Sequence, residues 1–284
     1  MTGALLATLL LVLPAEVRNP VVIEANAGVR YNPLGAATSV RVTLRQHLIA
    51  RESRLRSTQL GNTLLEPTSV GVATHTELTP AYLRTGVGVE ATPAAFWRMR
   101  ATWQGFAHFG TFNGLMSFDD RRAHHDPASI RERARTGRHH GPAISQRVIL
   151  ENLLQMRIWR LVAADQATAE GWSAHRKGWF YSGEYDLLMD GTGDVALKNI
   201  LVVGLGLGMR PRMPEMVVGG FHAFTRVLRS EGQNQQAGLA ILHTPVMDAW
   251  WLTRAGLIIL AGIHLQDRYK TGQPYFAAQV SVTL

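Results

Sequence analysis

The chain has 284 residues, a formal net charge of +8 and no cysteine, and its mean hydropathy is −0.01. Without cysteine it forms no disulfide, no thiolate metal site and no thiol nucleophile. Its arginines are spread along the whole chain instead of forming one basic helix or arm, which argues against a nucleic-acid partner. No break in composition divides the chain, so the sequence predicts one domain.

The amino terminus is an apolar run. Residues 1–15 read MTGALLATLLLVLPA, so a leucine-rich stretch is followed by Pro14 and Ala15, although no Lys or Arg precedes it. This composition is typical of a secretory signal peptide and its cleavage site. We therefore predict a signal peptide over 1–15, with a buried helix or an opening strand as the alternative. The run is too short to span a bilayer as a helix.

From residue 21 onward, apolar and polar residues alternate with a period of two. In 95–110, Trp97, Met99 and Trp103 fall on one face, and Arg98 and Arg100 fall on the other. This period indicates β-strands with two unlike faces. Twelve such segments are predicted, at about 21–32, 37–50, 67–78, 83–91, 95–110, 143–162, 179–189, 195–209, 217–227, 235–245, 251–265 and 275–284.

The stretch 111–142 interrupts the alternation and is predicted to be one long loop. It holds six arginines and two histidine pairs, His124-His125 and His139-His140. Asp126 followed by Pro127 is typical of a helix start, so a short basic helix is expected inside the loop. A metal site would need at least three suitable ligands in reach, and adjacent histidines rarely bind one ion together. We predict no metal and a solvated basic segment at a membrane surface.

Charged residues fall almost entirely on one face of the predicted strands. An arginine that faced lipid at the centre of a bilayer would cost about 2–4 kcal/mol, whereas a soluble barrel would carry its charges outside. The pattern therefore predicts an all-β fold, a closed antiparallel transmembrane β-barrel of about 12 strands spanning 21–284. The residues predicted to line its lumen are Arg41, Arg45, Arg84, Arg98, Arg100, Glu151, Arg157, Glu184, Asp186, Lys198, Arg226 and Arg254.

The carboxyl terminus adds a resemblance to a known class. The last segment, Phe276-Ala-Ala-Gln-Val280-Ser-Val282-Thr-Leu284, is similar to the closing strand of Gram-negative outer-membrane β-barrels, although it ends in Leu where those typically end in an aromatic residue. The resemblance concerns architecture, is porin-like, and identifies no subfamily. It implies an outer-membrane location, with the bilayer, lipopolysaccharide and, during insertion, the barrel-assembly machinery as partners.

Acyl hydrolysis would need a serine nucleophile, a histidine base and an orienting carboxylate or amide. His75, His108, His222 and His264 are predicted to face inward, and Ser117 and Ser182 are available, but no spacing matches a known hydrolase motif. We therefore assign no catalytic residue and no cofactor, and expect these histidines to join the hydrogen bonds of the lumen.

Two functions follow from the predicted barrel. Among charges predicted to face inward, cations outnumber anions by eleven to six. The first hypothesis is a narrow passive channel for small solutes, biased toward anions because arginines in a pore repel cations. The alternative is a closed barrel tied by Arg–Glu pairs, with a lipid-acting enzymatic (acyl hydrolase) role or a surface-binding or structural role. The sequence does not predict an oligomeric state.

Overall fold

The computed structural model describes residues 20–32, 34–48, 68–110, 115–136, 143–209, 214–244 and 254–284. The signal peptide predicted at 1–15 lies outside these residues. The wall strands are β1 (Val21–Tyr31), β2 (Gly35–His47), β3 (Ser69–Leu78), β4 (Tyr82–Ala94), β5 (Trp97–His108), β7 (Ala143–Ile158), β8 (Leu161–Ser173), β11 (Asp194–Met209), β12 (Pro214–Val227), β13 (Gln233–His243), β14 (Arg254–Gln266) and β15 (Pro274–Thr283).

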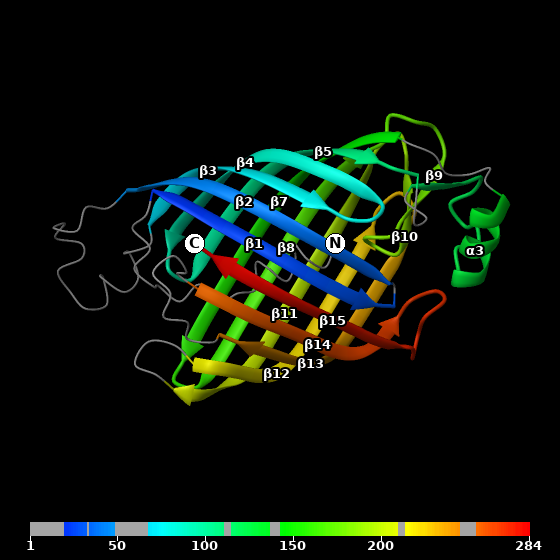
Figure 1. Ribbon diagram of the computed structural model, residues 1–284. Coiled ribbons are helices and arrows are strands. Elements are labelled where there is room, and N and C mark those ends of the chain that lie inside the picture. The colour runs from blue at the N-terminus through cyan, green and yellow to red at the C-terminus, as the bar shows by residue number, and fades with distance from the viewer. Residues whose placement is uncertain are drawn as a thin grey trace.

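These twelve strands form one closed antiparallel barrel, in the order β1-β15-β14-β13-β12-β11-β8-β7-β5-β4-β3-β2 (Figure 1). Closure pairs the first strand with the last, with Glu24 opposite Thr283 and Tyr31 opposite Phe276. The outer face carries exposed aliphatic and aromatic side chains, such as Leu44, Val72 and Leu150. A barrel that exposes such residues outside and pairs charges inside is suited to a bilayer, so the predicted fold class is confirmed.

Three short strands and one helix lie outside the wall. β6 (Met116–Phe118), β9 (Trp179–Ser182) and β10 (Leu187–Asp190) form a separate three-stranded sheet in the order β10-β9-β6, and α3 spans Pro127–Thr136. Ile130 of α3 packs on the sheet with Met116, Tyr181 and Leu188. We call this unit, residues 115–136 and 174–193, the cap. It lies at the barrel end opposite the carboxyl terminus (Figure 1).

The predicted strand count is correct, but two of the predicted strands are wrong. The segment 143–162 is not one strand: β7 ends at Ile158, and after a two-residue turn β8 begins at Leu161. Trp159 in that turn has a φ of 54°. The segment 179–189 is not in the wall, because its residues form β9 and β10 of the cap. One missed strand and one misplaced strand cancel in the total.

The predicted orientation of β12 is also wrong. Val217, Phe221 and Val227, predicted to face lipid, are buried inside the barrel. Arg226, predicted to line the lumen, is paired in register with Leu197, which faces outward, so Arg226 faces outward and is exposed. Residues 216–224 are apolar on both faces apart from His222, so the period of two has no clear phase there.

The outer face also carries one acid that the sequence pattern did not predict. Asp165 lies on the outward face of β8, where the Nδ2 of Asn199 donates a hydrogen bond of 2.6 Å to it. Nearby, the indole Nε1 of Trp97 donates to the Oδ1 of Asn152 at 2.6 Å. Polar groups facing a membrane are costly unless they find such partners, and these pairs reduce that cost.

Candidate functional site: an ion-paired lumen and its cap

The inward face of the wall has a charged part and an apolar part. Its acids and bases lie mainly on β1 to β7, with Glu170 on β8 and Lys198 on β11, whereas β8 and β11–β15 carry a buried apolar cluster. The members of that cluster are Val162, Ala164, Ile200, Val202, Val217, Phe221, Ala240, Leu242, Ile258, Leu260, Tyr275 and Ala277. The charged residues therefore occupy one part of the lumen, and apolar side chains fill the other.

The charged part contains two ion networks. The one that includes the cap hairpin is centred on Glu184, and we call it the upper network. This residue lies in the turn between β9 and β10, so the cap hairpin carries it to the wall. Its carboxylate accepts hydrogen bonds from Nη1 of Arg147 at 2.8 Å and from Nζ of Lys198 at 3.2 Å. Arg84 lies 3.8 Å away. One acid therefore contacts cations on β7, β11 and β4.

The same turn is also bound from β1. The guanidinium of Arg30 donates to the backbone carbonyl of Glu184 at 3.0 Å and to that of Gly183. At least four strands separate β1 from β7 and from β11 in either direction around the barrel. The hairpin turn thus spans the lumen and connects strands that are not neighbours in the barrel wall.

Wall acids complete the upper network. Glu170 on β8 pairs with Arg147 at 2.8 Å and with Lys198 at 2.6 Å. Arg84 pairs with Glu77 of β3. Because each cation keeps a wall carboxylate in addition to Glu184, the cost of removing these charges from water is offset at several points.

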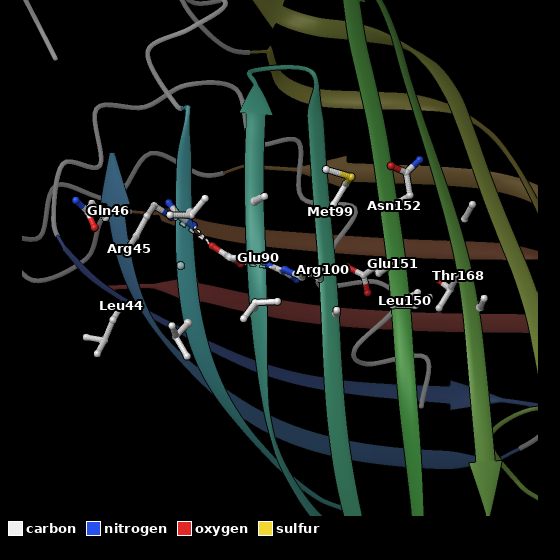
Figure 2. Close-up of a pocket in the computed structure, with 18 of the residues that line it drawn as sticks. Leu44, Arg45, Gln46, Glu90, Met99, Arg100, Leu150, Glu151, Asn152 and Thr168 are labelled. Atoms are coloured by element: carbon white, nitrogen blue, oxygen red, sulfur yellow. Dashed lines mark hydrogen bonds and ion pairs between the residues drawn. The ribbon is translucent and has the colours of Figure 1, made fainter. Parts of the chain in front are cut away.

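A lower network is centred on Arg100 of β5. Its guanidinium lies 3.1 Å from Glu90 of β4, and 3.6 Å from both Glu151 of β7 and Glu24 of β1. The contact with Glu24 crosses the lumen, since three strands lie between β5 and β1. Figure 2 shows Arg45, Glu90 and Arg100 joined by ion pairs, with Glu151 beside Arg100.

A glycine lets the lower network pass over β3. Gly71 is in register with Arg45 on one side and Glu90 on the other, and these two side chains pair across it at 2.7 Å. A Cβ at Gly71 would lie 2.9 Å from the carbonyl oxygen of Leu44 and 3.4 Å from Cγ of Glu90. A larger residue would therefore disturb the bridge between β2 and β4.

The other predicted lumen residues lie at the edge of these networks. Arg41 is half-buried and in register with Glu24, and Arg98 is buried on β5. The Nε of Arg157 donates to the carbonyl of Trp159 at 3.1 Å, at the β7–β8 turn. Arg254 begins β14, and its side chain lies outside the described residues.

Asp186 fastens the hairpin to another loop instead of lining the wall. Its carboxylate accepts a hydrogen bond of 2.6 Å from the hydroxyl of Tyr181 and pairs with Lys270 of the β14–β15 loop. All three side chains are buried. Asp186 has a φ of 60°, a left-handed conformation that Asp adopts more readily than most residues. The cap is therefore bound to the β14–β15 loop at the barrel rim as well as to wall residues inside the lumen.

Two central residues, Arg147 and Glu170, were absent from the predicted set. Alternation along β7 places Arg147 inward, on the same face as Glu151, so this signal was present in the sequence. Glu170 lies on β8, whose outward residues between Leu161 and Ser173 are Ala163, Asp165, Ala167, Ala169 and Gly171. Small residues on the outward face do not form the apolar pattern that identifies a lipid-facing strand. The polar residues Gln166, Thr168 and Glu170 do alternate on the inward face.

The structure brings one serine and one histidine together. The Nε2 of His108 lies 2.8 Å from the hydroxyl of Ser145, and both residues are buried. Among the described residues, Nδ1 of His108 has no hydrogen-bond partner, and the ring stacks on Phe106. The pair therefore lacks the orienting group that an acyl hydrolase needs. Ser182, one of the predicted candidates, lies instead on the cap hairpin.

Neither a metal cluster nor a membrane-spanning helix occurs in the described parts of the chain. No group of three or more His, Asp or Glu side chains there is arranged to hold a metal ion. No described helix is long and apolar enough to cross a bilayer.

No family model matches, and no curated protein matches. Among solved structures, the β domain of the Bordetella autotransporter BrkA aligns over 93% of this chain and 98% of its own, with 10% identity and a TM-score of 0.45. The translocator domain of autotransporter NalP from Neisseria meningitidis aligns over 94% and 89%, with 8% identity and a TM-score of 0.41.

A third match is OmpT, an outer-membrane protein of Vibrio cholerae, over 93% of this chain and 98% of its own, with 7% identity and a TM-score of 0.38. These likenesses concern the fold alone. The closed twelve-strand barrel and its apolar outer face define the class of this protein. It is a transmembrane β-barrel.

Proposed function

We propose that this protein is a closed outer-membrane barrel whose working surface is the cap. The observation that carries the proposal is the position of Glu184, which contacts Arg147 and Lys198 while Arg30 holds the same turn from across the lumen. A turn fastened to opposite walls blocks the path that a solute would take. This favours the closed-barrel alternative over the narrow anion channel.

The charge balance of the lumen supports the same choice. The anion bias expected from the sequence requires cations with spare charge. Arg45, Arg84, Arg100, Arg147 and Lys198 each have a carboxylate partner within 4 Å. A guanidinium paired with carboxylates attracts a passing anion less strongly, because the two charges largely cancel at a distance.

The orientation assigns the cap to the cell exterior. Outer-membrane barrels have short turns on the periplasmic side and longer connections outside. The longest connection, 109–142, and the connection 174–193 both lie at the cap end, whereas the two-residue turns after β4 and β7 lie at the other end, where residues 48–68 join β2 to β3. The cap then lies among lipopolysaccharide head groups, and the barrel-assembly machinery is the expected partner during insertion.

Planar-bilayer conductance of the purified full chain tests this proposal. The wild type is expected to give no stepwise current. Glu184→Ala is expected to give openings, because the bonds of the Glu184 carboxylate to Arg147 on β7 and Lys198 on β11 are lost, and of these two strands the turn keeps only the 3.3 Å hydrogen bond from Arg147 to the Tyr185 hydroxyl among the described hydrogen bonds. The matched control is Glu132→Ala, which removes an exposed acid of the cap from α3. A wild type that conducts steadily would overturn the proposal and restore the anion-channel hypothesis.

A further inference from the structure

The cap and the barrel rim enclose a cleft of about 480 Å³. Four segments that are distant in sequence form it: 121–125 before α3, 187–188 of β10, 230–233 at the start of β13, and 266–268 at the end of β14. A cleft of this volume is large enough for a small sugar-sized ligand.

The acids of the cleft already have internal partners. Glu231 pairs with Arg121 at 3.2 Å. Asp267 accepts hydrogen bonds from Nδ2 of Asn234 at 3.1 Å and from the backbone N–H groups of Tyr269 and Lys270 at 2.8 and 2.9 Å. Their negative charge is therefore largely compensated within the protein.

Two cations of the cleft are not compensated in this way. Within the described parts of the chain, neither Arg122 nor Arg268 has an ion-pair partner, and both are exposed. The guanidinium of Arg268 lies over the ring of Tyr269, 5.3 Å from its centroid. A guanidinium stacked on a ring keeps its N–H edge free for an incoming anion.

The remaining lining adds a neutral histidine and an apolar floor. The Nδ1–H of His125 donates to the carbonyl of Ala123 at 3.2 Å, and burial lowers the pKa of His125, so its Nε2 is left as an acceptor. Leu187 and Leu188 of β10, both buried, supply the apolar part of the lining. Such a site offers cations for an anion, an acceptor for a hydroxyl and an apolar surface for C–H groups.

We infer that this cleft binds a phosphorylated saccharide, with Arg122 and Arg268 on the phosphate and the sugar ring over Leu187 and Leu188. The planar guanidinium matches two phosphate oxygens at once, which favours phosphate over a diffuse negative charge. The inference rests on the proposed function, because it names what an outward-facing cap would bind. The phosphosugar could be free or part of a lipopolysaccharide head group.

Isothermal titration of the full-length protein in detergent micelles tests the site, with glucose 6-phosphate, unphosphorylated glucose and purified lipopolysaccharide as probes. The wild type is expected to bind a phosphorylated probe and not glucose. The double variant R122Q/R268Q should weaken binding at least about tenfold, and the matched control R131Q/R135Q, which removes two exposed charges from α3, less than about twofold. The variant R122K/R268K keeps the positive charges but lacks the planar guanidinium groups that bind two phosphate oxygens at once. It should therefore lose part of the affinity.

The probes distinguish the two sources of ligand. Binding of glucose 6-phosphate supports a free phosphosugar, and binding of lipopolysaccharide alone, through the same arginines, supports the surface lipid. Equal losses in R122Q/R268Q and in the control would overturn the inference, as would a wild type that binds neither phosphorylated probe. If the barrel is closed in conductance but binds neither probe, only this inference fails and the proposed function stands.

Discussion

The two ion networks of the lumen differ in the charge of their central residue and in origin. The upper one is centred on an acid, Glu184, which contacts three cations, whereas the lower one is centred on a cation, Arg100, which contacts three acids. All members of the lower network lie on wall strands, so it forms together with the barrel. The upper network depends on a hairpin that is not part of the wall. The barrel is therefore expected to survive damage to the upper network better than damage to the lower one.

The largest expected effect is on the lower network. Arg100→Gln leaves Glu24 and Glu151 without their shared cation, while Glu90 keeps Arg45. Breaking a buried pair of this kind costs about 3–5 kcal/mol, so the urea midpoint of the barrel in vesicles should fall clearly. As a control, Arg131→Gln on the exposed face of α3 should change the free energy of unfolding by less than about 0.5 kcal/mol. An unchanged midpoint for Arg100→Gln would contradict a structural role for this network.

A smaller and more local effect is expected where the hairpin joins the rim. Lys270→Met removes the cation that pairs with Asp186 and leaves that buried carboxylate with Tyr181 alone. The cap should lose about 3 kcal/mol or less of local stability, measured as faster hydrogen exchange over 179–190. Exchange in the wall strands should not change. Lys177→Met, at an exposed position beside the same hairpin, is the control. Equally fast hydrogen exchange over 179–190 in both variants would contradict a specific role of Lys270.

The smallest effect concerns the start of α3. The carboxylate of Asp126 accepts hydrogen bonds from the hydroxyl of Ser129 at 2.7 Å and from the backbone N–H groups of Ala128 and Ser129 at 2.8 and 3.0 Å. The hydrogen bond from the Ser129 hydroxyl is the largest cause that lowers the pKa of Asp126, and the backbone bonds add to it. Asp126→Ala should therefore cost α3 about 1 kcal/mol, seen as faster hydrogen exchange over 127–136.

The lowered pKa also fixes the direction of the pH dependence. A carboxylate whose pKa is lower in the folded state stabilises that state above its ordinary pKa of about 3.9, and this stabilisation is lost as the pH falls through the lower, folded value. The wild-type helix should thus open more readily as the medium is acidified below about pH 4. Asp126→Asn keeps a capping side chain that does not titrate, so its helix should lose this dependence. Identical pH profiles for the two proteins would contradict the assignment.

The sequence predicted the wall best where its two faces differ most in polarity. On β5, Trp97 and Trp103 alternate with Arg98 and Arg100, and the predicted orientation is the one in the structure. On β12 the inward face is apolar as well, because Phe221 and Val217 belong to the apolar part of the lining. When both faces of a strand are apolar, alternation does not indicate which face contacts lipid. The predicted inward and outward faces of β12 were therefore reversed.

The misplaced hairpin has a different physical cause. Residues 179–189 alternate like a wall strand, with Trp179, Tyr181 and Tyr185 at every second or fourth position. In the structure these aromatic side chains cover the cap sheet and the barrel mouth instead of facing lipid. A period of two reports that one face of a strand is apolar, but it does not report whether lipid or protein covers that face.

The alternation of residues alone was enough to predict a membrane barrel, because lipid requires an apolar outward face on each strand and the outward positions are largely apolar. The crossing of the lumen depends on the folded barrel. Glu184 meets Arg147, Lys198 and Arg30 because the closed sheet brings β1, β7 and β11 around one point, although these strands are far apart in the chain. Local periodicity carries no information about such partners, since they depend on barrel closure and on the path of a hairpin that belongs to no wall strand.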